Sequence, residues 1–454
     1  MKYLPALAAV CLLIVPSVVY SQQISPNPNP AGNRIEIDSS GAFNDLDFMN
    51  YGQIWLYKDS SLTNKAGATI TCDKETEATF WIEGGNFSNF GTLTLNGVVG
   101  PPFKSSELNI HGGTFENHGA IHTNGDLNAI GNVVVNNETS GTWINGASVL
   151  VVGTDAGSGL GNHGQITNNS DFTVKQFLNT GGINNKGHFY VRVMVNAGNI
   201  TNESKSLFSF GHGPNVNNGL VANHGMLNVE SDGTLTNESN GTITNNGVLE
   251  ITDGGGHYAD GVLVNHGSLV NDGRLANNGL LDNSNGSFTN NGSLEGSGTI
   301  KGNYTDHGHT KPGNSAGVMT IDGDYFKVDG TKEIELGGLF DGGGDKSLTE
   351  HDWLDVMGDV DLAGTLDVKL LGGFELHRGN VFNFLRVGGT LTGQYDGLGD
   401  GDLVGNFGGQ DLFITYGGGD GNDVVLFTNA VPEPTTVLIW SMLAGVGMSV
   451  RRRR

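Results

Sequence analysis

The sequence predicts an all-β protein: a parallel β-solenoid, or β-helix, followed by a C-terminal β domain that caps it and by a single C-terminal transmembrane helix. Three observations favour this fold class. The 74 glycines among 454 residues follow no collagen-like triplet, and helices tolerate so much glycine poorly. An Asn-Gly phrase recurs through the body of the chain, and an apolar run followed by four arginines closes it.

Composition limits the classes of function. The formal net charge is −24, and no basic stripe of the kind found in nucleic-acid-binding proteins is present, so we expect no nucleic-acid partner. Of the two cysteines, Cys11 lies in an apolar leader, which leaves Cys72 without a partner for an intramolecular disulfide. We expect Cys72 to be a buried small hydrophobic residue, and the body to depend on repetition and packing for its stability.

Residues 1–21 have the features of a secretory signal peptide. Lys2 precedes an apolar run, and small and polar residues near Ser21 provide a cleavage point. This leader predicts export through the Sec translocon. Residues 22–34 are rich in proline and asparagine and can form neither a helix nor a central strand, so they predict an extended spacer.

Residues 35–304 repeat the phrase Asn-(Asn/His/Asp)-Gly-x-(Leu/Ile)-x, and in its clearest run four leucines return at every sixth position: Leu263, Leu269, Leu275 and Leu281. This period fits a very short strand followed by a turn, and fits neither a heptad nor an amphipathic helix. Two or three such units would make one coil, so that successive coils stack Leu on Leu and Asn on Asn. We expect the Asn-Gly pair to turn the chain through positive φ angles. The alternative is a series of two-residue Asn-Gly hairpins, which need longer strands than the phrase leaves.

Histidine occupies the middle position of the phrase at four turns: His118, His163, His224 and His266. Imidazole is a common metal ligand, and stacked histidines could form a ladder. Their separations are irregular, however, and no cysteine or regularly spaced carboxylate accompanies them. We therefore expect turn residues in the left-handed region of φ/ψ space rather than metal ligands.

Residues 305–429 leave the phrase and alternate apolar with polar residues in short runs, which predicts further strands. The loop 312–317, the strand 364–366 and the Gly-Asp-Gly-Asn-Asp-Val ending resemble the segment that precedes the membrane or barrel portion of autotransporter-like surface proteins. We expect this domain to cap the open end of the solenoid. No translocating barrel is expected after it, so self-transport is not implied.

The same ending fits one nonapeptide of a Ca²⁺-binding repeat, which makes Asp420 and Asp423 weak candidate Ca²⁺ ligands. Because such sites form between successive turns and only one copy is present, we expect a turn before the last strand. No other cofactor is expected.

The C-terminal segment, residues 431–454, has three parts in order: Val431, Pro432, Glu433 and Pro434, then an apolar run, then Arg451, Arg452, Arg453 and Arg454. The prolines allow a helix to begin after them. The apolar run 435–450 would form a helix of about 24 Å, and the arginine stems can snorkel to span a hydrocarbon core of about 30 Å. By the positive-inside rule the arginines stay cytoplasmic and the body lies across the membrane.

This arrangement resembles the PEP-CTERM sorting signal of Gram-negative bacteria. The resemblance covers residues 431–454, and it implies recognition by an exosortase, processing near the Pro-Glu-Pro triplet, and a producer that makes exopolysaccharide and biofilm. The protein would be anchored in the membrane by its C-terminal helix before processing, and would then lie at the cell surface or outside the cell.

Three classes of function follow. The first is an exported structural or adhesive surface protein associated with exopolysaccharide or biofilm. The second is a carbohydrate-binding module, for which Trp55, Tyr57, Trp81 and Trp143 would line one exposed face. The third is a polysaccharide lyase or hydrolase. Hydrolysis would need two facing carboxylates, and no spacing selects a pair among the acids of the body: Glu230, Asp232, Glu238, Glu250, Asp253 and Asp260. We expect the first class and no enzymatic activity.

Overall fold

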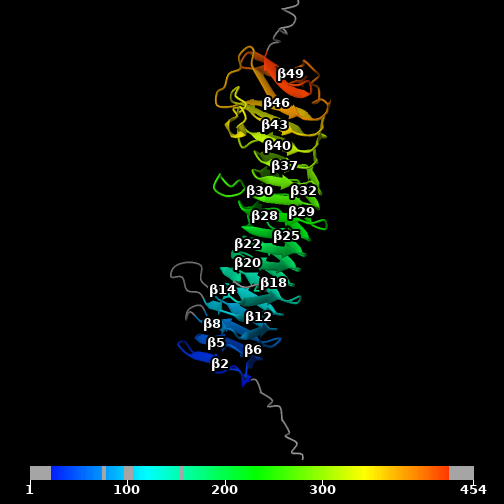
Figure 1. Ribbon diagram of the computed structural model, residues 1–454. Helices are drawn as coiled ribbons and strands as arrows, with labels where there is room; N and C mark the ends of the chain where they lie inside the picture. The colour runs from blue at the N-terminus through cyan, green and yellow to red at the C-terminus, as the bar shows by residue number, and fades with distance from the viewer. Residues whose placement is uncertain (1–21, 74–77, 97–105, 154–157, 429–454) are drawn as a thin grey trace, which may run out of the picture.

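The computed structural model describes residues 22–73, 78–96, 106–153 and 158–428. Over these residues the chain forms a long rod of short β-strands, with one 3₁₀ turn, η1 (Lys346–Leu348), among them. The strands climb along the rod in chain order (Figure 1), and they pair in parallel until the C-terminal end. The predictions of an all-β fold and of stacked parallel strands are confirmed.

Each coil contributes one strand to each of three faces. The first face consists of β2 (Arg34–Ile37), β5 (Gln53–Tyr57), β8 (Thr79–Glu83), β11 (Glu107–Ile110), β14 (Asp126–Gly131), β17 (Val149–Gly153), β24 (Leu207–Phe210), β27 (Met226–Val229), β30 (Val248–Ile251), β33 (Arg274–Asn277), β36 (Ser293–Gly296), β39 (His309–Pro312), β42 (Thr331–Leu336) and β45 (Thr365–Leu370).

The second face consists of β1 (Gln22–Gln23), β3 (Ala42–Asn44), β6 (Ser61–Asn64), β9 (Asn86–Asn89), β12 (Gly113–Asn117), β15 (Val133–Asn137), β18 (Gly159–Asn162), β25 (Gly213–Asn217), β28 (Gly233–Asn237), β31 (Val262–Asn265), β34 (Leu280–Asp282), β37 (Thr299–Lys301), β40 (Val318–Asp322), β43 (Trp353–Val356) and β46 (Val381–Val387). Two longer strands, β20 (Asp171–Asn179) and β22 (His188–Asn196), run through both faces.

The third face is a 16-stranded parallel sheet of β4 (Asp47–Asn50), β7 (Thr69–Cys72), β10 (Thr92–Leu95), β13 (Ala120–Thr123), β16 (Thr142–Asn145), β19 (Gln165–Asn168), β21 (Gly182–Asn185), β23 (Asn199–Asn202), β26 (Leu220–Asn223), β29 (Thr242–Asn245), β32 (Ser268–Asn271), β35 (Ser287–Asn290), β38 (Tyr304–Asp306), β41 (Tyr325–Lys327), β44 (Val360–Leu362) and β47 (Leu391–Gly393).

The six-residue phrase is one strand and one corner, and three phrases make a coil. Leu263, Leu269 and Leu275 lie on the second, third and first faces in turn, and the next strand returns to the second face. There Leu281 pairs with Leu263. Asn245 pairs with Asn271 in the same way on the third face. The predicted stacking of Leu on Leu and Asn on Asn is therefore confirmed, with three units to the coil.

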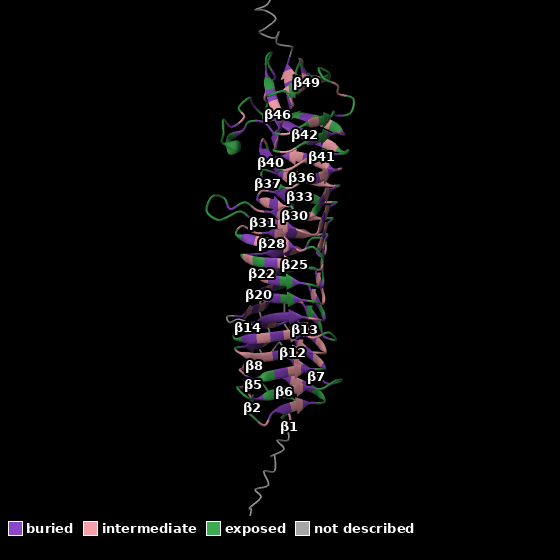
Figure 2. Cartoon of the chain, turned by 45° about the vertical axis from the view of Figure 1, so that its right-hand side comes forward, coloured by how far each residue is buried: buried purple, intermediate pink, exposed green. Residues whose placement is uncertain are grey.

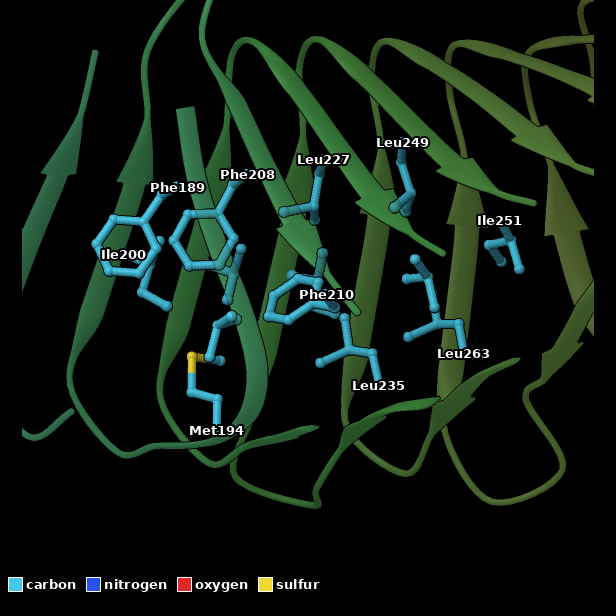
Figure 3. Packing of buried hydrophobic residues seen from close by; sticks show 14 of the residues in the cluster. Phe189, Met194, Ile200, Phe208, Phe210, Leu227, Leu235, Leu249, Ile251 and Leu263 are labelled. Carbon is cyan, nitrogen blue, oxygen red and sulfur yellow. The ribbon is translucent and has the colours of Figure 1, made fainter. Parts of the chain in front are cut away.

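The core is a continuous apolar column inside the coils. Buried residues recur in the strands along the rod (Figure 2). In the typical strand every second side chain is buried, as the alternation of a strand requires. Figure 3 shows side chains of successive coils stacked along this column. The rings of Phe172, Phe189 and Phe208 follow one another at centroid distances of 4.8 and 4.9 Å, close to the spacing of neighbouring strands.

The parallel coils continue beyond residue 304, the expected end of the solenoid, through β47. The pairing changes only at the end of the described chain, where β48 (Leu403–Phe407), β49 (Gln410–Gly418) and β50 (Asp423–Thr428) are antiparallel. β50 pairs antiparallel with β46, so this group covers one end of the rod (Figure 1).

Candidate functional site

Buried asparagines form two columns along the rod, which we call the first and second asparagine ladders. In the first, at the ends of second-face strands, each Nδ2 donates to the Oδ1 of the next coil at 2.6 to 2.9 Å. Its members are Asn44, Asn64, Asn89, Asn117, Asn137, Asn162, Asn179, Asn196, Asn217, Asn237, Asn265 and Asn283. The second, at the ends of third-face strands, has bonds of 2.7 to 2.8 Å. Its members are Asn145, Asn168, Asn185, Asn202, Asn223, Asn245, Asn271 and Asn290.

Most ladder amides also satisfy backbone groups at the corner of the coil. Asn185 accepts from the N–H of Gly187 at 3.3 Å through Oδ1, and its Nδ2 donates to the carbonyl of Leu207 at 2.9 Å. Because buried polar groups are costly when unpaired, this arrangement specifies asparagine at the position. The ladders fix the register of the coils, since a slip of one residue would unpair every rung.

The repeat glycines have a different role from the expected one. Gly181, Gly198 and Gly219 are not among the glycines with positive φ, so the expectation of left-handed corners is wrong for them. A Cβ at Gly219 would instead lie 2.1 Å from the carbonyl oxygen of Gly198 in the preceding coil, and one at Gly198 would lie 2.0 Å from that of Gly181. Glycine is needed because successive corners approach too closely for any side chain.

The four phrase histidines do not adopt the left-handed region either, because positive φ among described non-glycine residues is confined to Asp59, Lys205 and Asp232. His163 Nδ1 lies 2.7 Å from Thr180 Oγ1 in the next coil, and the His266 ring lies 3.7 Å from a Glu238 oxygen. Among the described residues no group of three His, Cys, Asp or Glu side chains could hold a metal ion.

Three of the four aromatic candidates, Trp55, Tyr57 and Trp81, lie on the outer side of the first face. The rings of Trp55 and Trp81 stack with their centroids 5.1 Å apart and an angle of 15° between the ring planes. The other sides of these rings are also occupied. The Arg34 guanidinium lies 3.9 Å over Trp55, and His111 packs edge-on against Trp81 at 5.3 Å. Tyr57 stacks beside Trp55 at 6.1 Å. A sugar ring that stacks on an indole needs a free face, and this outer stack offers little.

Trp143 does not belong to this outer stack, so the four aromatics do not share the one exposed face that would favour a carbohydrate-binding module. It is 1 % exposed and lies inside the coils against Phe172. Its Nε1 donates to Thr123 Oγ1 at 3.2 Å, and that hydroxyl donates to Asn145 Oδ1 at 2.9 Å. Trp143 therefore supports the beginning of the second asparagine ladder.

The two candidate Ca²⁺ ligands are separated in role. Asp423 is buried, and its carboxylate accepts from Asn383 Nδ2 at 2.7 Å and from the N–H of Val387 at 2.9 Å. Asp420 lies exposed in the turn before β50. Asp423 thus holds β50 against β46, and its oxygens already have partners within the protein.

The second ladder ends in a buried ionisable cluster that the sequence interpretation missed. Asp306 occupies the next ladder position after Asn290, and its Oδ1 accepts from Asn290 Nδ2 at 2.8 Å. In the following coil the same position is taken by Lys327, whose Nζ lies 2.9 Å from Asp306 Oδ2. Both side chains are 0 % exposed. The sequence does carry a signal, because Asp306-His307-Gly308 fits the repeat phrase with aspartate in place of its first asparagine.

Burial shifts the protonation equilibria around this pair. Lys332 has no hydrogen-bond partner for its Nζ, and burial lowers its pKa to about 7. Burial raises the pKa of Asp352 to about 8, and raises the pKa of Tyr325 well above its ordinary value. The interior of the rod at this level therefore favours neutral forms of ionisable groups.

The sorting residues, Val431 to Pro434 and Arg451 to Arg454, lie outside the described residues, as does the predicted signal peptide 1–21. Within the described ranges, no helix has the length and apolar character needed to cross a membrane. No protein-family model matches the chain, and no curated protein matches it in sequence.

Proposed function

We propose that this protein is an exported, non-enzymatic structural or adhesive component of the cell surface or extracellular matrix, associated with exopolysaccharide or biofilm. The observation that carries the proposal is the unbroken stack of parallel coils, whose interior is filled by apolar columns and asparagine ladders. Such a rod gains length coil by coil and holds its shape without disulfides. Its three long faces offer many weak, repeated contacts to a polymer.

The ends complete the proposal. The antiparallel strands β48 to β50 act as a cap that protects the last coil from edge-to-edge pairing. Residues 431–454 act as a PEP-CTERM sorting signal, with a membrane helix between the triplet and the arginines. An exosortase would process the chain near the triplet after export through the Sec translocon. The formal net charge of the whole chain, −24, suits a soluble exported rod.

The two alternatives receive less support from the geometry. A carbohydrate-binding module would use the stack of Trp55 and Trp81, yet Arg34 and His111 occupy its outer ring faces. A glycoside hydrolase would need two carboxylates across a groove. Of the hollows in the described part of the rod, the one lined by Val134 and Phe177 contains no carboxylate, and the one lined by His163 and Thr180 contains only Glu203. Two others contain more than one carboxylate: Glu36 and Asp38 in one, and Asp355, Asp420 and Asp423 in the other. In the latter, Asp355 is paired with Lys346 at 2.6 Å and Asp423 accepts from Asn383 at 2.7 Å, so two of its three carboxylates already have protein partners.

Fractionation of producing cells tests the sorting part of the proposal. Three chains are compared: the full chain, a chain lacking residues 431–454, and a chain with alanine at Pro432, Glu433 and Pro434. We expect the deletion to abolish the membrane-held precursor, and the alanine chain to remain membrane-bound at the precursor mass. Thr435→Ala, next to the triplet, is the matched control and should be processed normally. The same distribution and mass for all chains would refute the sorting role.

Retention of the purified body on the producer's exopolysaccharide tests the adhesive part. Because the proposed contacts are spread along the rod, Trp81→Ala should leave retention nearly unchanged. Loss of retention in Trp81→Ala would favour the carbohydrate-binding module instead. If the unsubstituted body is not retained, the adhesive role is refuted and only the structural role remains.

A further inference from the structure

Asp306 and Lys327 are held in a geometry that favours a reaction between them. They are register partners in adjacent parallel strands, β38 and β41, and both point into the rod. Lys327 Nζ lies 2.9 Å from Asp306 Oδ2, with both side chains fully excluded from water. Two reacting groups held in contact inside a rigid scaffold need no encounter step, which removes a large entropic part of the barrier.

The two oxygens of Asp306 have different surroundings. Oδ1 accepts from Asn290 Nδ2 at 2.8 Å and from the N–H of Gly308 at 3.1 Å. Two fixed N–H donors on one oxygen are the arrangement that stabilises an oxyanion. Oδ2 instead accepts from the hydroxyls of Thr310 at 2.6 Å and Tyr325 at 2.9 Å, as well as from Lys327.

The lysine nitrogen also substitutes for a ladder amide nitrogen. In the second ladder, Asn223 Nδ2 donates to the carbonyl of Gly225, two residues further on, at 3.2 Å. Lys327 Nζ donates to the carbonyl of Gly308, two residues after Asp306, at 2.6 Å. Asp306 Oδ1 and Lys327 Nζ thus make the bonds that the oxygen and nitrogen of one asparagine amide would make.

We propose that Asp306 and Lys327 condense to form an intramolecular isopeptide bond. One proton moves from the Lys327 ammonium to Asp306 Oδ2, which gives a neutral amine and a carboxylic acid. Nζ then attacks Cγ, and the negative charge that develops on Oδ1 is stabilised by Asn290 and Gly308. A second proton passes from Nζ to Oδ2, the Cγ–Oδ2 bond breaks, and water leaves. The pair itself supplies both protons, so no other reactant is needed.

The surroundings favour this condensation. An ion pair in a dry interior carries a large desolvation cost, which an amide product would remove. The nearby Lys332 amine is pushed towards its neutral form by the same burial, which lowers its pKa to about 7. Tyr325 remains a protonated donor because burial raises its pKa well above its ordinary value. In the product, Oδ1 and the new N–H keep the bonds to Asn290 and Gly308 described above.

The bond would lock two successive coils together near the C-terminal end of the rod. This goes beyond the proposed surface function, since it concerns the covalent structure of the body and holds whether or not the sorting signal operates. It would also provide a cross-link in a mature body for which no intramolecular disulfide is expected.

Peptide mass spectrometry of the purified full-length chain tests the proposal. Chymotrypsin cuts after aromatic residues, and cuts at Tyr304, Tyr325 and Phe326 place Asp306 and Lys327 on separate peptides. We expect these two peptides to remain joined, with a total mass lower than their sum by one water, and fragmentation to place the link at Asp306 and Lys327. Recovery of both peptides separately at full mass, from a chain with the circular dichroism of a β-protein, would overturn the proposal.

Two variants complete the experiment. Lys327→Met should abolish the linked species, and Lys332→Met, which removes the neighbouring buried amine, should retain it. Loss of water that persists in Lys327→Met would assign the mass change to another reaction, such as cyclisation at an Asp-Gly sequence, and would also overturn the proposal. The measurement on the unsubstituted chain decides the matter even if a variant fails to fold.

Discussion

The asparagine ladders allow a sharp test, because the turn at Asn245 places two asparagines side by side with opposite exposure. Asn245 is fully buried, and Asn246 is exposed. Asn245 Oδ1 accepts from Asn223 at 2.7 Å, and its Nδ2 donates to Asn271 Oδ1 at 2.7 Å and to the carbonyl of Arg274 at 2.9 Å. Asn245→Ala would therefore deprive three groups of a hydrogen bond, the buried amides of Asn223 and Asn271 and the partly buried carbonyl of Arg274.

The expected loss follows from these three bonds. A buried polar group left unpaired costs about 1 to 3 kcal/mol. Asn223 Nδ2 keeps its bonds to the carbonyls of Val248 at 2.8 Å and of Gly225 at 3.2 Å, so the cost of losing its bond to Asn245 lies at the lower end of this range. We expect Asn245→Ala to lower the free energy of unfolding by about 4 kcal/mol. Asn246→Ala, in the same turn, should change it by no more than about 0.5 kcal/mol.

Urea unfolding followed by intrinsic fluorescence measures the difference between the two variants. Because stacked coils can open locally, native-state hydrogen exchange of the strands around residue 245 should accompany it. We expect accelerated exchange in Asn245→Ala that decays towards distant coils. A difference between the two variants of less than about 1 kcal/mol, with unchanged exchange, would refute the stabilising role of the ladder.

Three further predictions concern the interior. Gly219→Ala should lower the free energy of unfolding, measured in urea, by several kcal/mol, because its Cβ would lie 2.1 Å from the Gly198 oxygen. Gly417→Ala, where a Cβ would meet open space, should leave the free energy of unfolding nearly unchanged. Equal effects of the two substitutions would contradict the close-packing argument. Lys332 has a pKa of about 7 in the fold against an ordinary value of 10.5, so the unfolded chain binds more protons between these values and stability rises with pH there. Lys332→Met should therefore stabilise the protein most below pH 7 and least near pH 10.5. If urea titrations show a gain in the free energy of unfolding that does not depend on pH, burial of the charged amine is not its cause. Burial raises the pKa of Cys72 to about 11, so its thiol should react with a disulfide reagent only after unfolding, and rapid labelling of the native chain would show that it is accessible.

The repeat phrase was sufficient to predict the parallel stack, because it specifies both the apolar column of the core and the asparagine ladders. The residue two positions after each phrase glycine points inward, as Leu269 does after Gly267, and the asparagine that ends the strand joins a ladder. The same rule accounts for Trp143, which stands two positions after Gly141 and is buried. Trp55 stands three positions after Gly52 and faces outward. Reading the phrase residue by residue would have separated these tryptophans.

Other features could not follow from residue types alone. From the sequence, a glycine in the phrase is equally compatible with a left-handed turn and with a close approach between coils. Only the backbone geometry of the corner distinguishes the two roles. The sequence also did not indicate that the coils continue beyond residue 304, because the repeat phrase ends there. Stacking of parallel backbones does not require asparagine, and tyrosine at Tyr304 and Tyr325 continues the inward column after the phrase has ended.

The direction of the hydrogen bonds in the ladders explains why the buried charges of Asp306 and Lys327 lie at the end of the second ladder. Every ladder amide donates towards the C-terminal end, so each ladder must begin by accepting from a donor and end by donating to an acceptor. The first begins with Gln23 Nε2, which donates to Asn44 at 3.1 Å, and ends when Asn283 donates to the carbonyl of Asn303 at 2.8 Å. A neutral backbone acceptor ends that ladder without any charge.

The second ladder ends on a side chain instead. Asn290 donates to Asp306, and a carboxylate, which has only acceptors, terminates the series of donors. A buried carboxylate cannot stand alone, so the next coil must supply a cation, and Lys327 provides it from the next ladder position. The chemistry of the asparagine ladder thus leads, rung by rung, to an amine and a carboxyl group in contact inside a dry interior. That is the condition under which an amide bond between them becomes the lower-energy way to end the series.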